Sequence, residues 1–563
     1  MRILLLCHAF NSLSQRIFAE LEAAGHELSV ELDIGDDVTR QALDLFEPDA
    51  IVAPFLKRRI PDDIWQAVPC LIVHPGPPGD RGPNALDWAI LDHKPHWGVS
   101  VIKANGELDG GPVLAFEQFT MRRARKSNLY RREVTEAAVR ALFRALETLG
   151  RKSSVSRSAE GRWRDAVPAD ARRIDWAHDD TETVLKKIDS ADGAPGVLDR
   201  IGDLAVRLFD ARAEHRLTGP PGTLLARCQG AVCRATIDGA IWIGHLKLAE
   251  KTTFKTVAVD VLGELGADLP EVPALPQAGS EDHGDGRGDI SYREQGPVGI
   301  LEFNFYNGAM STRNCRALLQ AWAHATEQTT RVIVLAGGAD FWSNGMDLNT
   351  IEAASSPADE SWNNIRAIDE LAKAVINTSS HLSVSALAGN AAAGGVFLAL
   401  AADRVWARRG VVLNPHYKNM GNLFGSEYWT YLLPRRVGAD NIGQVMDHRL
   451  PMLAARAQAL GLVDAIGPND PERFGRFVLE QAKTLAGPAW EEQLAQKRQQ
   501  RKSDEATRPL ADYRDAELGR MRMNFYGFDP SYHVARYRLV RRTPHAWTPL
   551  YLARHRRLDW KQR

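Results

Sequence analysis

The chain has 563 residues, with 70 Lys and Arg against 71 Asp and Glu and a formal net charge of −1. At about 100 to 200 residues per domain, this length predicts roughly three or four domains. The balanced charge excludes a global field that would steer the protein onto nucleic acid or an anionic membrane, so any basic site must be local.

The cysteines and the apolar stretches favour a soluble protein of a reducing compartment, and we expect it in the cytoplasm. Five cysteines are too few and too scattered for a disulfide framework. Only Cys228 and Cys233 are close enough to suggest a metal pair, and without a second pair or nearby His ligands we interpret them as buried thiols and expect no metal. The opening apolar run is too short for a signal peptide. The longest small-apolar stretch, residues 391–402, is well below the roughly 18 to 20 residues that cross a bilayer.

Short apolar runs alternate with helical periodicity in residues 1–161. Residues 2–7 and 70–73 predict strands, and residues 15–24 predict a helix that ends at Gly25. This alternation is typical of an α/β domain with a largely parallel sheet. The turn after the first strand has no Gly-rich phosphate fingerprint, so we expect no dinucleotide site there.

Four further regions follow, which differ in composition. Residues 162–262 contain an amphipathic segment followed by short β-like runs, which predicts a small mostly-β domain. Residues 263–289 are rich in Gly, Pro, Asp and Glu and predict a linker. Residues 290–480 predict a second α/β domain. Residues 481–563 predict a mostly helical, basic tail, because they carry 18 Lys and Arg against 9 Asp and Glu.

A histidine and an aspartate form the first candidate site. His74 stands where a buried strand gives way to a Pro- and Gly-rich loop, and Asp109 lies in a Gly-rich turn ahead of another predicted strand. On adjacent strand ends, the carboxylate can orient or charge the imidazole, which then donates a proton to a developing oxyanion or a leaving amine. Taken singly, each residue has a structural alternative: a lone histidine in a core position, and an aspartate that only shapes a turn.

Together these residues resemble the formyltetrahydrofolate-dependent formyltransferase and hydrolase family. The matching motifs are His74 before its Pro-rich loop, Arg81-Gly82, Trp88-Ala89-Ile90 and Asp109-Gly110-Gly111-Pro112. The resemblance extends over residues 169–248 and implies 10-formyltetrahydrofolate as formyl donor, with His74 and Asp109 as catalytic residues. The family's catalytic asparagine, two residues before the histidine, is replaced here by Ile72.

Two Gly-centred turns, residues 341–348 and 388–395, form the second candidate site. Each precedes helix-like sequence, and turns of this kind leave backbone N–H groups unpaired. Two such groups that converge on one point make an anion site. The alternative is a pair of tight turns packed under a core helix.

Residues 298–466 resemble the crotonase (enoyl-CoA hydratase/isomerase) family. The Gly345-Met346-Asp347-Leu348 turn, the Gly394-Gly395 turn and the Ala402-Asp403-Arg404 sequence match that family's motifs. The resemblance implies that the amides of Met346 and Gly394 hold the carbonyl oxygen of a coenzyme A thioester. The two catalytic glutamates of hydratases are replaced by Phe397 and Tyr417, so we do not expect water addition to an enoyl thioester.

A formyl thioester explains the loss of both glutamates, because formyl-CoA has no α- or β-carbon for them to act on. It can instead lose its formyl proton and expel thiolate, which gives carbon monoxide and CoA and requires a base and a proton donor. Tyr417 and Glu427 are the candidates, since aromatic neighbours could raise the pKa of Glu427. The alternative is that Glu427 pairs with Arg435 or Arg436 and that Tyr417 only packs.

The chain as a whole resembles the HypX (HoxX) hydrogenase-maturation family, most specifically in residues 413–438 and 524–530. The resemblance implies a multidomain α/β fold with a formyltransferase-like parallel-sheet domain, a small mostly-β domain and a crotonase-like α/β spiral with a helical tail. It implies formyl transfer from 10-formyltetrahydrofolate to CoA and then decarbonylation, which makes the CO ligand of the iron in [NiFe]-hydrogenase. The implied partners are small-molecule substrates and an iron-carrying maturation scaffold, with no nucleic acid and no membrane.

Basic residues outside the two sites are candidates for the CoA phosphates, namely Arg131, Arg536, Arg541 and Arg542. A solvated basic helix face is the alternative for the three arginines of the tail. Two other functions stay open: a formyltetrahydrofolate or formyl-CoA hydrolase that releases formate, and a non-catalytic protein that binds folate or CoA. The oligomeric state is open as well.

Overall fold

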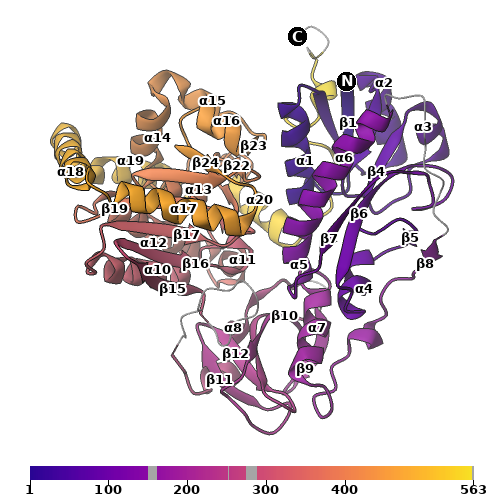
Figure 1. Cartoon of the computed structure of the whole chain (residues 1–563), viewed down its shortest axis with the longest axis horizontal. Coiled ribbons are helices and arrows are strands. Elements are labelled where there is room, and N and C mark those ends of the chain that lie inside the picture. Colours follow the sequence, from indigo (N-terminus) through magenta and orange to yellow (C-terminus); the bar gives the residue numbers. More distant parts are fainter. Residues whose placement is uncertain (150–160, 251–252, 274–287, 559, 561–563) are drawn as a thin grey trace.

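The computed structural model describes residues 1–149, 161–250, 253–273, 288–558 and 560, and these form three sheet-based parts and a helical tail (Figure 1). Among the described residues, no helix is both long and apolar enough to cross a membrane. Residues 274–287 of the predicted linker lie outside the described part. Just before them, the helical turn α9 (Glu264–Ala267) occupies sequence that we predicted to be linker.

The N-terminal part is an α/β unit whose six-stranded sheet has the order β2-β1-β3-β4-β6-β7. The first four of these strands are parallel, and β6 and β7 run antiparallel to their neighbours. The elements are β1 (Arg2–Cys7), α1 (Ser12–Ala23), β2 (Glu27–Leu32), α2 (Asp36–Phe46), β3 (Ala50–Ala53), α3 (Asp62–Ala67), β4 (Cys70–His74), β5 (Asp80–Arg81), α4 (Ala85–Leu91), β6 (His96–Lys103), β7 (Val113–Thr120), α5 (Lys126–Leu129), the π-helical turn η1 (Tyr130–Val134), α6 (Thr135–Leu149) and β8 (Arg162–Trp163).

Apolar patterning accounts for this sheet. The strand β1 reads Arg-Ile-Leu-Leu-Leu-Cys and is buried on both faces, as parallel strands covered by helices are. On one face its side chains meet those of α1 and α6 in a single hydrophobic cluster. Strand β4 lies in the interior of this sheet and ends at His74. This histidine therefore lies at the carboxyl ends of the strands, where the Pro- and Gly-rich loop begins.

The middle part is an antiparallel sheet of order β11-β12-β13-β10-β9, with β14 paired to β13. Its strands enclose an apolar cluster that α7 covers with Val184 and Ile188. The elements are η2 (Ala169–Arg172), α7 (Thr181–Ala191), β9 (Val197–Ile201), β10 (Leu204–Glu214), β11 (Leu224–Cys228), β12 (Ala231–Ala235), β13 (Ala240–Leu248), β14 (Thr256–Val257) and α8 (Ala258–Leu262). The predicted mostly-β character of this region is therefore observed.

The third part is built on two sheets, of order β15-β16-β17-β19-β21-β24 and β18-β20-β22-β23. Strands β16 to β24 of the larger sheet are parallel, and α10 and α12 pack on them. The elements are β15 (Ile290–Gln295), β16 (Val298–Phe303), η3 (Tyr306–Gly308), α10 (Thr312–Thr326), β17 (Val332–Gly337), β18 (Phe341–Ser343), α11 (Leu348–Ala353), α12 (Pro357–Ile376), β19 (Leu382–Leu387), β20 (Asn390–Ala392), α13 (Gly394–Leu400), β21 (Arg404–Arg408), β22 (Val412–Asn414), α14 (Trp429–Val437), η4 (Ala439–Asn441), α15 (Ile442–Met446), β23 (Met452–Leu453), α16 (Ala454–Ala459), β24 (Ala465–Gly467) and α17 (Pro471–Leu485).

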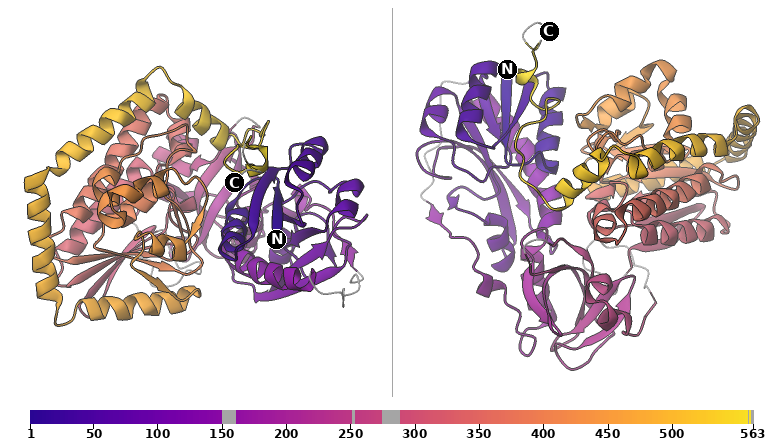
Figure 2. Two further views of the ribbon diagram at one scale, coloured as in Figure 1. Left: turned by 90° about the horizontal axis from the view of Figure 1, so that it is seen from above. Right: turned by 180° about the vertical axis from the view of Figure 1, so that it is seen from behind.

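The tail first runs around the outside of the third part and then crosses to the N-terminal part (Figure 2). Its helices are α18 (Trp490–Thr507), α19 (Leu510–Tyr526), α20 (Ser531–Val540) and the short η5 (Arg554–Arg556). Beyond α20 the chain runs along strand β2, where Val30 N–H donates to Leu552 O at 3.0 Å. There the Nε2 atom of His555 lies 3.0 Å from Glu31 Oε2, and both side chains are buried. The tail therefore ties the third part to the N-terminal sheet.

Candidate functional site

His74 lies between two carboxylates at the end of β4. Its Nε2 atom is 2.9 Å from Asp80 Oδ2, and its Nδ1 atom is 3.7 Å from Asp109 Oδ1. Asp109 in turn accepts the backbone N–H of Gly82 at 3.1 Å. The structure thus brings His74 and Asp109 together, as predicted, but the carboxylate within hydrogen-bond distance of the imidazole is that of Asp80.

The loop after His74 depends on a glycine for this geometry. A Cβ atom on Gly76 would lie 2.4 Å from Asp80 Oδ2 and 2.6 Å from His74 Nε2, so a larger residue would separate the pair. Ser100 Oγ and Trp97 Nε1 hold the loop by donating to the carbonyls of Gly76 and Pro75, each at 2.8 Å. Sequence reasoning missed Asp80, although its place six residues after the histidine, in the turn before Arg81-Gly82, was a usable signal.

The two Gly-centred turns of the third part meet, as predicted. Gly345 has φ +76°, and a Cβ atom on it would lie 3.4 Å from the backbone N of Gly394. Helix α13 begins at Gly394, so the first amides of this helix have no partner within it. Met346 and Gly394 both line one cavity, described below. This arrangement can hold a carbonyl oxygen.

Glu427 and Tyr417 lie beside that position. The Tyr417 hydroxyl donates to Glu427 Oε2 at 2.5 Å, and the ring stacks on Phe397 with centroids 5.4 Å apart. A Cβ atom on Gly394 would come within 2.1 Å of Glu427 Oε1, which places the carboxylate directly against the start of α13. The pairing alternative for Glu427 is wrong, because Arg435 binds Asp504 and Arg436 binds Asp464.

Two further buried carboxylates surround this pair, and sequence reasoning missed both. Asp369 of α12 and Glu517 of α19 each accept hydrogen bonds from the turn that carries Glu427. Burial, with the nearby Asp369 charge, raises the pKa of Glu427 to about 8. Burial likewise raises the pKa of Asp369 to about 6 and that of Glu517 to about 8. Burial and the neighbouring Glu427 also raise the pKa of Tyr417, so its phenol stays protonated and can donate.

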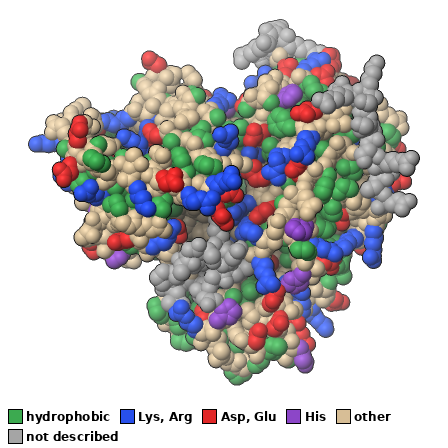
Figure 3. Space-filling model, viewed as in Figure 1, with side chains coloured by type: hydrophobic (Ala, Val, Ile, Leu, Met, Phe, Trp, Pro, Cys, Tyr) green, Lys and Arg blue, Asp and Glu red, His purple; other side chains and the backbone are tan. Residues whose placement is uncertain are grey.

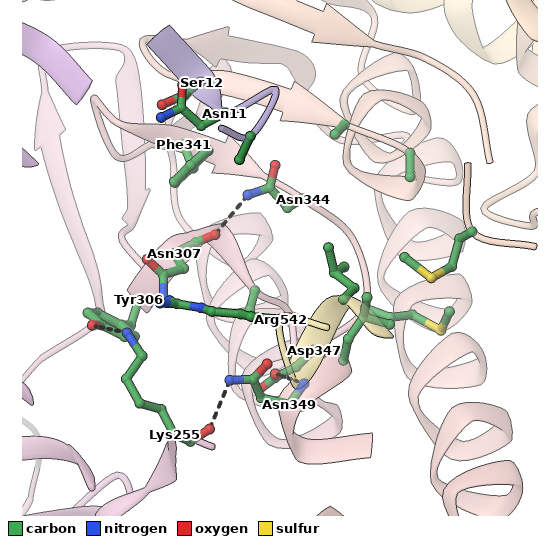
Figure 4. A pocket seen from close by; sticks show the side chains of 18 of the residues that line it. Asn11, Ser12, Lys255, Tyr306, Asn307, Phe341, Asn344, Asp347, Asn349 and Arg542 are labelled. Atoms are coloured by element: carbon green, nitrogen blue, oxygen red, sulfur yellow. Dashed lines mark hydrogen bonds between the residues drawn. The ribbon is translucent and has the colours of Figure 1, made fainter. Parts of the chain in front are cut away.

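One cavity of about 2840 Å³ runs between the N-terminal, middle and third parts. Its wall includes Pro75, the residue after His74, and also Gly394, Tyr417 and Glu427. Between these ends, polar side chains from the N-terminal part, the middle part, the third part and the tail line the cavity (Figure 4). There the Lys255 ammonium donates to the Tyr306 hydroxyl at 3.0 Å, and burial lowers the pKa of Lys255 to about 8.

The four candidate arginines divide into two pairs. Arg131 and Arg542 line the cavity, where Arg131 contacts Asn307 at 2.8 Å and Arg542 contacts the carbonyl of Gly193 at 3.4 Å. The prediction for Arg536 is wrong, because its side chain is buried and binds Glu352 at 2.9 Å. Arg541 contacts the same carboxylate at 3.2 Å, so it too is engaged away from the cavity.

Lys and Arg side chains are nevertheless present on the surface between the third part and the N-terminal part. Figure 3 shows Lys and Arg side chains near the middle of one face, interleaved with acidic ones. All five cysteines are buried, and the described residues contain no cluster of three or more His, Cys, Asp or Glu side chains that could hold a metal ion.

Comparison with known proteins follows the same division of the chain. Residues 25–146 match the formyl transferase family, residues 167–259 match the formyl transferase C-terminal domain, and residues 300–523 match the enoyl-CoA hydratase/isomerase family. Over 561 residues the chain is 52% identical to the hydrogenase maturation factor HoxX of Bradyrhizobium diazoefficiens, covering 99% of this chain and 97% of that protein. The chain belongs to the HoxX family of hydrogenase maturation factors.

Solved structures of this family have the same fold. A crystal structure of HypX from Aquifex aeolicus in complex with tetrahydrofolic acid is 47% identical, with a TM-score of 0.96 over 99% of both chains. A crystal structure of a variant of that protein also has 47% identity and a TM-score of 0.96, over the full length of both chains. The family and the multidomain α/β fold expected from the motifs are thereby confirmed. One chain of this fold carries both candidate sites.

Proposed function

We propose that this HoxX-family protein makes carbon monoxide in two steps, through formyl-CoA. The first step transfers a formyl group from 10-formyltetrahydrofolate to the CoA thiol, and the second splits formyl-CoA into CO and CoA. The observation that carries the proposal is the single cavity whose wall reaches from Pro75, beside His74, to Gly394, Tyr417 and Glu427.

In the first step, the CoA thiol attacks the formyl carbon, and the carbon–nitrogen bond to the folate breaks. His74 and its carboxylate neighbours supply the proton that the departing folate nitrogen takes up, and the thiol proton is released in exchange. Ile72 offers no polar atom where related enzymes carry asparagine, and it packs in an apolar cluster. The complex of HypX from Aquifex aeolicus with tetrahydrofolic acid supports folate as a ligand of this family.

In the second step, the formyl C–H and C–S bonds both break. Ionised Glu427 takes the formyl proton, the C–H electron pair remains on carbon as the lone pair of CO, and the C–S pair leaves with sulfur. The thiolate then receives a proton from the Tyr417 and Glu427 pair, so no oxidant or reductant is needed. The amides of Met346 and Gly394 hold the carbonyl oxygen while this occurs.

Coupling of the two steps follows from the shared cavity. CoA whose nucleotide is held near Arg131 and Arg542 keeps its thiol on a flexible pantetheine arm, which can present it first to the folate and then to Glu427. A tethered intermediate reacts at high effective concentration and is shielded from hydrolysis. We propose that the CO serves the iron of [NiFe]-hydrogenase, delivered to a scaffold that carries that iron.

The test is to supply purified protein with 10-formyltetrahydrofolate carrying a labelled formyl carbon, with and without CoA. Headspace gas is trapped on reduced haemoglobin, and formate is assayed in solution. We expect labelled CO that depends on CoA. Labelled formate without CO would instead identify a hydrolase, and binding of folate or CoA without any product would identify a non-catalytic protein.

A further inference from the structure

The backbone at Glu427 has a geometry that its own residues do not favour. Glu427 has φ +62° and Tyr428 has φ +60°, so two consecutive residues with side chains occupy the left-handed region. Such a conformation persists only where the surrounding structure imposes it, and it is concentrated at functional sites. Some other part of the molecule must therefore hold this turn.

Asp369, on α12, holds the first half of the turn. Its Oδ1 accepts the backbone N–H of Glu427 at 2.9 Å, and both of its carboxylate oxygens accept the Ser426 hydroxyl at 2.9 Å. All three side chains are fully buried, so water does not compete for these bonds.

Glu517, on tail helix α19, holds the second half. Its Oε2 accepts the backbone N–H of Tyr428 at 2.9 Å, and its Oε1 accepts the backbone N–H and the hydroxyl of Thr430 at 2.8 and 2.6 Å. The Ser426 hydroxyl also lies 3.3 Å from Glu517 Oε2, which joins the two carboxylates through one side chain. The backbone N–H groups of Glu427 and Tyr428, the two residues in the left-handed region, thus both donate to carboxylates of distant helices.

We infer that Asp369 and Glu517 are positioning residues of the decarbonylation site, which fix the turn that aims the Glu427 carboxylate at the thioester carbon. The inference rests on the proposed function and extends it to the tail. Without these bonds, the backbone at Glu427 and Tyr428 relaxes towards negative φ, and the carboxylate swings away from the start of α13. The tail helix α19 is then a part of the second active site.

The charge of Asp369 has a second effect on Glu427. The titratable or charged groups that face Glu427 and its turn are Asp369 of α12, Glu517 and Arg514 of α19, Tyr417 of the preceding loop and Cys315 of α10. Among the charges, that of Asp369 is the strongest that raises the pKa of Glu427. The substitution Asp369→Asn keeps a hydrogen-bond acceptor for the turn but removes the negative charge. It therefore tests the positioning role separately from the effect of Asp369 on the pKa of Glu427.

The test measures CO release from supplied formyl-CoA as a function of pH, with formyl-CoA formation from 10-formyltetrahydrofolate as an internal reference. Asp369→Ala and Glu517→Ala should each lower kcat roughly 100-fold, as a displacement of about 1 Å does, with KM and formyl transfer unchanged. Asp369→Asn should restore most of kcat and move the rise of activity with pH to lower pH. Asp515→Asn, an exposed acid on the same helix α19, is the matched control and should behave as wild type.

Each outcome decides the inference. Folded alanine variants with wild-type kcat, or equal losses in the alanine and asparagine variants at position 369, would overturn it. If the alanine variants do not fold, Asp369→Asn decides alone, and a wild-type pH profile in that variant counts against the inference. Wild-type protein that releases no CO from formyl-CoA overturns the proposed function, and this inference with it.

Discussion

The two candidate sites are built in different ways. His74 has its carboxylate neighbours close in sequence, since Asp80 is 6 residues away and Asp109 follows in the same sheet-based part. Glu427 has neighbours that are remote, with Asp369 58 residues before it and Glu517 on a tail helix beyond the third part. The first site lies where strand β4 meets the loop after it, whereas the second is enclosed among helices.

This difference fits the chemistry proposed for each site. Formyl transfer joins two substrates, and its acid/base group lies at the end of strand β4, next to Pro75 of the cavity wall. Decarbonylation acts on one bound thioester and needs a strong base, which burial supplies by raising the pKa of a carboxyl group. Perturbation of the second site should therefore change pH dependence, and perturbation of the first should change transfer alone.

The largest expected effect is the separation of the half-reactions. His74→Ala should lower formyl transfer by roughly 100- to 10,000-fold, as loss of an acid/base group does, and leave CO release from supplied formyl-CoA unchanged. Glu427→Gln should do the reverse and let formyl-CoA accumulate. Chromatography of CoA esters, combined with CO trapping, measures both. If both variants fail in the same half-reaction, the division of labour between the sites is wrong.

The next effect concerns the close approach at the start of α13. Gly394→Ala places a methyl group 2.1 Å from Glu427 Oε1, so the carboxylate must move, and we expect a loss of CO release of roughly 100-fold. Gly475→Ala is the matched control, because nothing lies within 4 Å of the added Cβ on helix α17. Equal activity of the two variants would contradict the placement of Glu427.

The pH dependence sharpens the comparison further. Because Glu427 acts as a base only when ionised, and its pKa is raised to about 8, kcat/KM for formyl-CoA should rise with pH through about 8. Tyr417→Phe removes a hydrogen bond that favours the ionised form. The residual activity of that variant should therefore rise only at higher pH, which a stopped assay over pH 6 to about 10 can measure. A shift in the opposite direction would rule out Glu427 as the base.

The smallest expected effect distinguishes the arginines of the tail. Arg542→Ala should raise KM for CoA roughly tenfold, which corresponds to about 1.4 kcal/mol, without change in melting temperature. Arg536→Ala should leave KM for CoA unchanged. It should lower the melting temperature, because it removes a positive charge that pairs with the buried Glu352 carboxylate. Titration of CoA and thermal unfolding of both variants check this, and a raised KM for CoA in Arg536→Ala would restore that residue as a CoA ligand.

Much of the fold and part of the site were predictable from local patterns. The strand at residues 2–7, the mostly-β middle part and the turns at Gly345 and Gly394 follow from apolar periodicity and turn chemistry, which act over a few residues. Arg536 was misassigned because the charge of a side chain is visible in the sequence, whereas its burial against Glu352 is not.

The sequence by itself determined the order of the parts, the family and the expectation that His74 and Asp109 meet at adjacent strand ends. Only the tertiary structure decided that Asp369 and Glu517 converge on Glu427, that one cavity extends from Pro75 to Glu427 and that the tail runs along strand β2. The physical reason is that helix and strand patterns are local. Burial, and the pKa values that it sets, depend on which distant segments pack together.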